Sequence, residues 1–225
     1  MFDIDGTLVL TGGAGGRAMS SASRDVFGQD GAYPGAAFSP NGRTDAWIIA
    51  QFAGNHPLAD HPATLARFHG AYLEHLAREI EQPGPRKGVM PGVRPLLDTL
   101  SGRHDVILGL LTGNLEAGAR LKLEHFDLWK YFSFGAFGGE TVDRNSLLAV
   151  AIDRAEIVHG VRFPPSQVVM VGDTPFDVEV ARVGGARSVA VATGGHDRAA
   201  LSASGADIVL EDLSNLHASL AAFGL

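Results

Sequence analysis

Two aspartates at the start of the chain have the spacing of a site for a cation or a phosphate group. Asp3 and Asp5 stand two residues apart, and Gly6 and Thr7 follow them. Because side chains alternate between the two faces of a strand, both carboxylates would point to the same side. A Gly-Thr turn after them would present backbone N–H groups to an anion. Taken alone, Asp-x-Asp is more typical of an acidic surface loop.

Further polar residues follow two apolar runs later in the chain. They are Thr112, Gly113 and Asn114 after Val106–Leu111, and Asp173 and Asp177 after Val168–Val171. A hydroxyl and backbone donors can hold phosphate oxygens. Four carboxylates brought together would repel one another, which implies a hard divalent cation. Mg²⁺ is the natural candidate, because it takes few carboxylates and leaves room for phosphate oxygens and water.

The elements that must position these residues alternate between strand and helix from about residue 103 onward. Strands are predicted over 106–111, 132–137, 168–171, 188–192 and 208–210. Helical spacing follows the first of them, through Leu115, Ala119, Lys122, Leu123 and Phe126. This alternation predicts an α/β fold with a Rossmann-like parallel sheet. Ligands of such sheets bind outside the carboxyl ends of the strands, where the four aspartates, Thr112 and Asn114 would meet in one crevice.

The segment from about residue 12 to 88 predicts helices in place of strands. The expected helices cover 18–27, 45–52 and 63–80, and glycines and prolines border the segment on both sides. Borders of this kind suit two hinges, because glycine bends the backbone freely. We therefore expect a Rossmann-like core formed by residues 1–11 and 89–225, with a small α-helical cap domain inserted at 12–88.

The motifs resemble those of a known superfamily. Asp3–Leu8, Leu111–Asn114 and Gly172–Asp177 are similar to motifs one, two and four of the haloacid dehalogenase-like hydrolases. The resemblance keeps their order over the whole chain and is strongest to the phosphoglycolate phosphatase-like branch. It implies a Mg²⁺-dependent phosphatase that acts on a small phosphorylated metabolite through an aspartyl-phosphate.

The resemblance also implies roles for the motif residues. Asp3 would be the nucleophile, and Asp5 the general acid and then the general base. The metal would be bound by the carboxylates of Asp3 and Asp173 and the main-chain carbonyl of Asp5, with Asp177 acting directly or through water. The phosphoryl oxygens would be bound by Gly6, Thr7, Thr112, Gly113 and Asn114, a task that consists mostly of positioning and electrostatics.

Two features depart from the family pattern. The third motif usually contains a lysine, whereas here the matching position holds Arg144, which supplies the charge as a planar fork. The alternative is a solvated arginine near a helix start. In addition, only Met1 and Phe2 precede Asp3. Either the first strand is short or the true start lies upstream.

Arg43 is the candidate contact from the cap to the substrate. It stands in the sequence Gly-Arg-Thr-Asp, directly before a predicted helix. The guanidinium could reach the phosphate or the distal part of the substrate when the cap closes. A loop arginine beside a helix N-cap at Thr44 accounts for the same sequence equally well.

Composition limits the classes of function. With 18 Lys and Arg against 25 Asp and Glu, the net charge is −7, which argues against a nucleic-acid partner. The absence of cysteine excludes disulfides and thiolate chemistry. No apolar run is long enough for a membrane span, and we expect a cytoplasmic protein of unassigned oligomeric state. Two other functions stay open: a phosphomutase similar to β-phosphoglucomutase, and a non-catalytic regulator that binds a phosphorylated ligand.

Overall fold

The computed structural model describes residues 1–28, 39–54, 61–139 and 141–225. The helices are α1 (Ala14–Phe27), α2 (Asp45–Ala53), α3 (Pro62–Glu79), α4 (Val93–Ser101), α5 (Glu116–His125), α6 (Leu147–His159), α7 (Pro175–Gly184), α8 (Arg198–Ala203) and α9 (Leu216–Phe223), with 3₁₀ turns η1 (Trp129–Tyr131), η2 (Arg144–Ser146) and η3 (Pro165–Gln167). The strands are β1 (Val9–Leu10), β2 (Gly88–Val89), β3 (Leu110–Thr112), β4 (Gly135–Phe137), β5 (Val169–Gly172), β6 (Arg187–Val191) and β7 (Ile208–Leu210).

The N-terminal segment lies in the middle of a parallel sheet. β3 pairs with β4, β5 with β6, and β6 with β7, each in parallel. Phe2 joins the two halves through parallel bridges to Leu110 of β3 and Val171 of β5. The order across the sheet is therefore β4-β3-Phe2-β5-β6-β7, and the predicted α/β class with a parallel sheet is confirmed.

Two strands are shorter than the apolar runs that predicted them. β3 begins at Leu110, four residues later than expected, and β4 begins at Gly135, three residues later than expected. A strand exists only where a neighbour supplies hydrogen bonds, and β3 and β4 pair over three residues each. β5, β6 and β7 lie within one residue of their predicted ranges.

Apolar side chains on the two faces of the sheet pack against different helices. On one face Leu110 and Val171 pack with buried residues of α4, α5 and α9. On the other face Leu111 and Met170 pack with buried residues of α6 and α7. Consecutive strand residues point to opposite faces, so each continuous apolar run supplies both cores.

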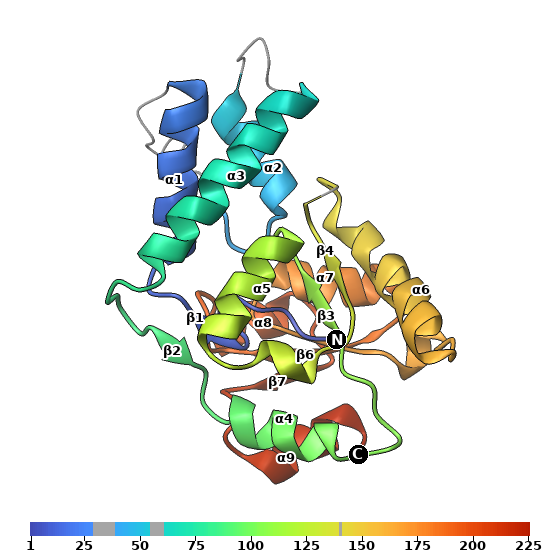
Figure 1. Cartoon of the computed structure of the whole chain (residues 1–225). Helices are drawn as coiled ribbons and strands as arrows, with labels where there is room; N and C mark the ends of the chain where they lie inside the picture. The colour runs from blue at the N-terminus through green and yellow to red at the C-terminus, as the bar shows by residue number, and fades with distance from the viewer. Residues whose placement is uncertain (29–38, 55–60, 140) are drawn as a thin grey trace.

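The helices α1, α2 and α3 pack together beside the α/β part (Figure 1). Their shared core includes Phe52 of α2 and Phe68, Tyr72 and Leu76 of α3, all buried. Phe68, Tyr72 and Leu76 recur at helical spacing, so they form the face by which α3 packs against its neighbours. The bounds of α2 and α3 match the predicted ranges within one residue, whereas α1 begins at Ala14, four residues before the predicted start.

A short antiparallel pair connects the two parts. Val9 pairs with Val89 and Leu10 with Gly88, so the two chain crossings run side by side as β1 and β2. No sequence pattern predicted this pairing, because two-residue strands are too short to show a periodicity. The division into a core and a cap at residues 12 and 88 stays a prediction. Over the described ranges, no helix combines the length and apolarity needed to cross a membrane.

Candidate active site

Loops at the carboxyl ends of three neighbouring strands supply the site residues. Asp3 follows Phe2, Thr112 ends β3, and Asp173 follows β5. Backbone hydrogen bonds fix the register, since Asp3 N donates to Val171 O at 2.9 Å and Leu111 N donates to Phe2 O at 2.9 Å. The central strands therefore end at the same level, where the carboxyl edge of a parallel sheet places ligands.

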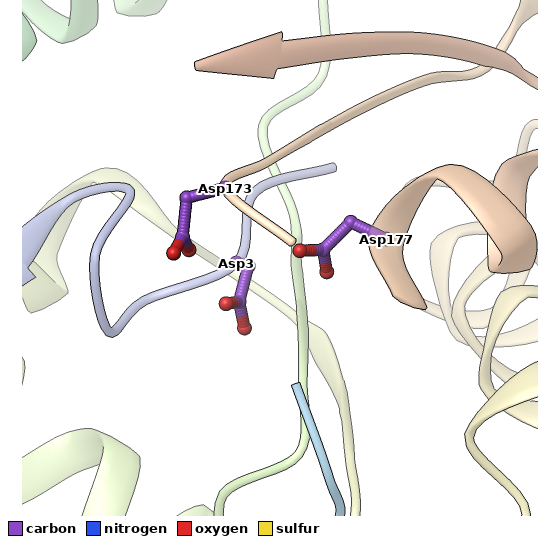
Figure 2. A group of neighbouring side chains, drawn as sticks. All are labelled: Asp3, Asp173 and Asp177. Atoms are coloured by element: carbon purple, nitrogen blue, oxygen red, sulfur yellow. The ribbon is translucent and has the colours of Figure 1, made fainter. Parts of the chain in front are cut away.

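The carboxylates of Asp3, Asp173 and Asp177 converge on one point (Figure 2). One oxygen from each lies within 4.8 Å of the others, and all three residues are buried. Burial, together with the charges of Asp177 and Asp5, raises the pKa of Asp3 to about 7 against the opposing effects of Arg144 and a hydrogen bond from Thr112. Burial also raises the pKa of Asp173, with added repulsion from Asp177 and Asp3.

The guanidinium of Arg144 lies among these carboxylates. Its Nη2 is 3.3 Å from Asp3 Oδ1 and bonds Asp177 Oδ1, while Nη1 donates to the carbonyl of Gly42 at 3.0 Å. Burial by itself would lower the pKa of Arg144, but the neighbouring carboxylates, Asp177 first, raise it above its usual range. Arg144 is 7% exposed, so the structure does not place it as a solvated surface arginine.

Asp177 is held by the start of α7. Its Oδ2 accepts from Thr174 N at 3.0 Å and from Thr174 Oγ1 at 2.7 Å. The first of these bonds is half of a capping box, whose other half is the Thr174 side chain accepting from the backbone N–H of Asp177, and Pro175 occupies the first turn. The other oxygen of Asp177 accepts from Arg144. With contacts to both oxygens, Asp177 holds Arg144 against Asp3, and a metal would reach it most simply through water.

The residues around Asp3 and Asp173 fit a hard divalent cation. Three buried carboxylates beside one guanidinium carry excess negative charge, and carboxylate oxygens are the ligands that Mg²⁺ takes. Thr7 Oγ1 fixes Asp173 by donating to its Oδ1 at 3.1 Å. Gly6 covers the same carboxylate with a φ of +89°, and a Cβ there would lie 2.5 Å from Asp173 Oδ2. The close approach of this turn therefore requires glycine.

The carboxylate of Asp5 lies outside this group of three, although Asp5 lines the same cavity as Asp3 and Asp173. Its Oδ2 accepts from Lys122 Nζ at 2.7 Å and from Asn114 Nδ2 at 2.8 Å. The Asp5 side chain is 40% exposed, in contrast to the buried Asp3. Asp3 and Asp5 thus have different surroundings although they are two residues apart. Metal ligation through the Asp5 carbonyl stays a prediction.

Four of the five predicted phosphate-binding residues line the same cavity of about 380 Å³ as Asp3 and Asp5, namely Gly6, Thr112, Gly113 and Asn114. Thr112 is buried, and its Oγ1 accepts from Asn114 Nδ2 at 2.8 Å. Gly113 is packed so closely on the loop before α2 that a Cβ would overlap the Arg43 carbonyl oxygen. Thr7, whose hydroxyl bonds Asp173, stands beside this set without a place in the cavity lining.

Arg43 lines the cavity from the loop before α2. Its guanidinium lies 4.6 Å from the ring centre of Trp47 and 4.3 Å from that of Phe176, a cation–π arrangement with both rings. Thr44 caps α2 by accepting from Trp47 N at 3.2 Å. The N-cap that was one alternative is therefore present, and Arg43 still faces the cavity.

Two site residues were missed by the sequence reasoning. Lys122 was placed on the apolar stripe of α5, but its side chain is buried and bonds Asp5. Asp45 was taken only as a helix start, but its Oδ2 accepts from Leu115 N at 2.7 Å, so it ties α2 to the loop after β3. A lysine among the apolar positions of a helix was the available signal for Lys122, because lysine is rarely buried without a partner.

Asp45 provides a test of this contact. Burial raises its pKa to about 6, against the opposing effects of Lys122 and the Leu115 N–H. The pKa of Asp45 is higher in the folded protein than the unfolded value of 3.8, so folded Asp45 still holds a proton at a pH where unfolded Asp45 has released it. Protonation of Asp45 therefore stabilises the folded state at low pH, and this stabilisation is lost as pH rises from about 4 to 6. Asp45→Asn lacks this loss and should gain about 2 kcal/mol over wild type between pH 4 and 7.

The measurement is the free energy of urea unfolding of both proteins across this pH range, in EDTA. The same substitution at exposed Asp153, which pairs with Arg162, is the control for the exchange of a carboxylate for an amide. A wild-type minus Asp45→Asn difference that is flat with pH would contradict the prediction.

Comparisons with known proteins show which family this chain resembles. A family model described as HAD-hydrolase-like matches residues 146–216, which include Asp173 and Asp177. The chain is 31% identical to a phosphoglycolate phosphatase of Rhodospirillum rubrum over 96% of this chain and 88% of that protein. It is also 31% identical to a phosphoglycolate phosphatase of Synechococcus elongatus, over 64% of this chain and 65% of that one.

A solved structure shares the fold. The crystal structure of CbbY from Rhodobacter sphaeroides, in complex with phosphate, aligns over 100% of this chain and 97% of its own with a TM-score of 0.73 and 20% identity. The similarity to the Rhodospirillum rubrum protein extends over nearly the whole of this chain, and the shared fold agrees with it. Together they identify the family. The chain belongs to the haloacid dehalogenase-like hydrolases, in their phosphoglycolate phosphatase-like branch, and is a phosphoric monoester hydrolase.

Proposed function

We propose that this protein is a Mg²⁺-dependent phosphatase that hydrolyses a small phosphomonoester through an aspartyl-phosphate on Asp3. The observation that carries the proposal is the position of Asp3, at the cavity wall with Arg144 3.3 Å away and Asp173 beside it. The guanidinium and a cation would together offset the charge of an incoming phosphate. The relatives named phosphoglycolate phosphatase support a small anionic substrate.

Phosphate binding would satisfy a donor that the protein leaves open. Arg144 is buried at the cavity, and within the described part of the chain its Nε has no hydrogen-bond partner. A buried N–H without a partner costs about 1 to 3 kcal/mol, which a phosphoryl oxygen would recover. The hydroxyl of Thr112 and the backbone near Gly6 and Gly113 line the same wall.

The reaction follows from the two environments of Asp3 and Asp5. An Asp3 oxygen attacks phosphorus, the bond from phosphorus to the leaving oxygen breaks, and the proton of the Asp5 carboxyl passes to that oxygen. Water then attacks phosphorus, its proton passes to the Asp5 carboxylate, and the bond from phosphorus to Asp3 breaks. Inorganic phosphate and the alcohol are released, and both carboxyl groups return to their starting forms.

The remaining residues hold this arrangement. Asp3 and Asp173 would bind Mg²⁺, which when bound supplies positive charge against the phosphoryl oxygens. Asp177 keeps Arg144 in place, and Thr7 does the same for Asp173. The helices α1–α3 would act as a cap that excludes water, with Arg43 directed to the distal part of the substrate. Residues 12–88 would form this cap and the rest of the chain the catalytic core.

Phosphate release from a panel of small phosphomonoesters, phosphoglycolate included, tests the proposal. We expect turnover in Mg²⁺ and a fall of at least about 10³-fold in EDTA, because removing the cation leaves the carboxylates to repel the phosphate. Turnover undiminished by EDTA would contradict the metal requirement, and no turnover across the panel would contradict the function. Phosphorus NMR with a hexose phosphate distinguishes a mutase, which would give an isomer instead of free phosphate.

A further inference from the structure

Lys122 is a buried cation that none of the motifs contains. It comes from the second turn of α5 and is 4% exposed. Its Nζ donates to Asp5 Oδ2 at 2.7 Å and to Asn114 Oδ1 at 2.6 Å. Removing an ammonium group from water is costly unless it is paired and hydrogen-bonded. Both of these partners belong to the site, so the charge of Lys122 is directed at the reaction centre.

Asn114 completes a closed set of contacts around the same carboxylate. Its Nδ2 donates to Asp5 Oδ2 at 2.8 Å and to Thr112 Oγ1 at 2.8 Å, while its Oδ1 accepts from Lys122. These contacts fix the orientation of the amide, because the nitrogen faces two acceptors and the oxygen faces a donor. Lys122, Asn114 and Asp5 therefore form a three-membered network, which we call the Asp5 clamp.

The clamp engages one oxygen of Asp5 and leaves the other open. Among the described residues, every side-chain hydrogen bond to the Asp5 carboxylate reaches Oδ2. The side chain is 40% exposed, and it lines the cavity. Because Asn114 and Lys122 both donate to Oδ2, the carboxyl group has a fixed orientation. Its other oxygen, Oδ1, is left available to the cavity.

We propose that Lys122 is a positioning residue that, with Asn114, holds Asp5 so that Oδ1 exchanges protons with the leaving oxygen. This inference rests on the proposed function, and it assigns a role to a residue outside the superfamily motifs. In this role Lys122 would act through Asp5, to which its Nζ donates, and not through a bond to the phosphate or the metal. Proton transfer needs donor and acceptor within hydrogen-bond reach, so a freely rotating Asp5 would spend most of its time misplaced.

The dependence on the leaving group tests this role. An alkoxide leaves poorly without a proton, whereas p-nitrophenolate leaves without one. For Lys122→Met, which keeps the apolar stem, we expect kcat/KM on an alkyl phosphate to fall by on the order of 10²-fold and kcat/KM on p-nitrophenyl phosphate to change by less than about 3-fold. The ratio kcat/KM is compared because it reports formation of the aspartyl-phosphate, whereas kcat also includes its hydrolysis, which uses Asp5 as the base with both substrates.

Matched variants make the result specific. Lys130→Met removes an exposed lysine that pairs with Asp127 and should leave both substrates unaffected. In an Asp5→Asn background, Lys122→Met should cause no further loss on the alkyl phosphate, because two residues that act through one group are not additive. Lys122→Arg keeps the charge and replaces the point donor by a fork, so an intermediate loss is expected and serves if Lys122→Met does not fold.

Three outcomes would overturn the inference. Equal losses on both substrates would assign Lys122 a structural role, and a rise in KM with unchanged kcat would make it a substrate-binding cation. Additive losses in the Asp5→Asn background would show that it acts independently of Asp5. Failure of the proposed function is distinguishable, because wild type itself would then show no phosphate release.

Discussion

Replacing Asp3 by asparagine is expected to lower kcat for phosphomonoester hydrolysis by on the order of 10⁴-fold or more, because the amide cannot form the aspartyl-phosphate. The loss should be the same for alkyl and aryl phosphates, since the nucleophile is needed whatever the leaving group. Phosphate release under saturating substrate and Mg²⁺ measures it. Beryllofluoride, which forms a stable adduct with a competent Asp3, should be retained by wild type and not by the variant.

The Asp3→Asn protein should remain folded. Its side chain has the same shape, and Asp177 still holds Arg144. The folded pKa of about 7 lies above the unfolded 3.8, so wild type without metal loses stability as pH rises through this window, and the variant lacks that loss. Circular dichroism and thermal melts verify the fold. Asp153→Asn, at an exposed site, is the control, and activity of Asp3→Asn near that of wild type would refute the nucleophile assignment.

Replacing Arg144 by methionine is expected to reduce both activity and stability. Removing one donor to the transferring group costs about 10²- to 10³-fold in kcat. Removing the partner of buried charges also destabilises, and we expect a loss of about 3 kcal/mol in the free energy of unfolding, because Asp3 and Asp177 are left uncompensated. Kinetics with an alkyl phosphate and urea unfolding in EDTA measure the two effects.

Two comparisons separate charge from geometry at this position. Arg144→Lys restores the charge but cannot bond Asp3, Asp177 and the Gly42 carbonyl at once, so it should recover most of the stability and part of kcat. Arg162→Met removes an exposed arginine that pairs with Asp153 and Glu156 and should cost less than about 1 kcal/mol. If the Arg144→Met protein were as active as wild type, the proposed role of Arg144 in catalysis would be contradicted.

The fold could be predicted where local pattern and tertiary structure agree. The apolar runs at β5, β6 and β7 are strands within one residue of prediction because each has a partner along its length. The run at 106–111 was predicted too long because hydrophobicity records burial, whereas strand formation requires a neighbouring strand. The pairing of β1 with β2 could not be predicted, since it joins segments 80 residues apart through two residues each.

The acidic residues of the site and Arg144 could be predicted from the sequence, whereas the role of Lys122 could not. Asp3 and Asp173 follow central strands, and a parallel sheet brings the ends of such strands together. Lys122 reaches Asp5 from the second turn of α5, across 117 residues of sequence. The direction of the Lys122 side chain depends on how α5 packs on the sheet. Helical spacing predicts that Lys122 lies on a buried face, but it does not predict which residue the ammonium group contacts.

The residues at the strand ends, by their type and order, determined the α/β fold, the superfamily and the position of the acidic site, because strand period and sheet polarity fix where such side chains point. Tertiary structure alone decided how the four carboxylates divide. Asp3, Asp173 and Asp177 are buried together around Arg144, whereas Asp5 pairs with Lys122 at the cavity. The physical reason is that charge pairing depends on distances between segments, and these distances are set only when helices pack on the sheet.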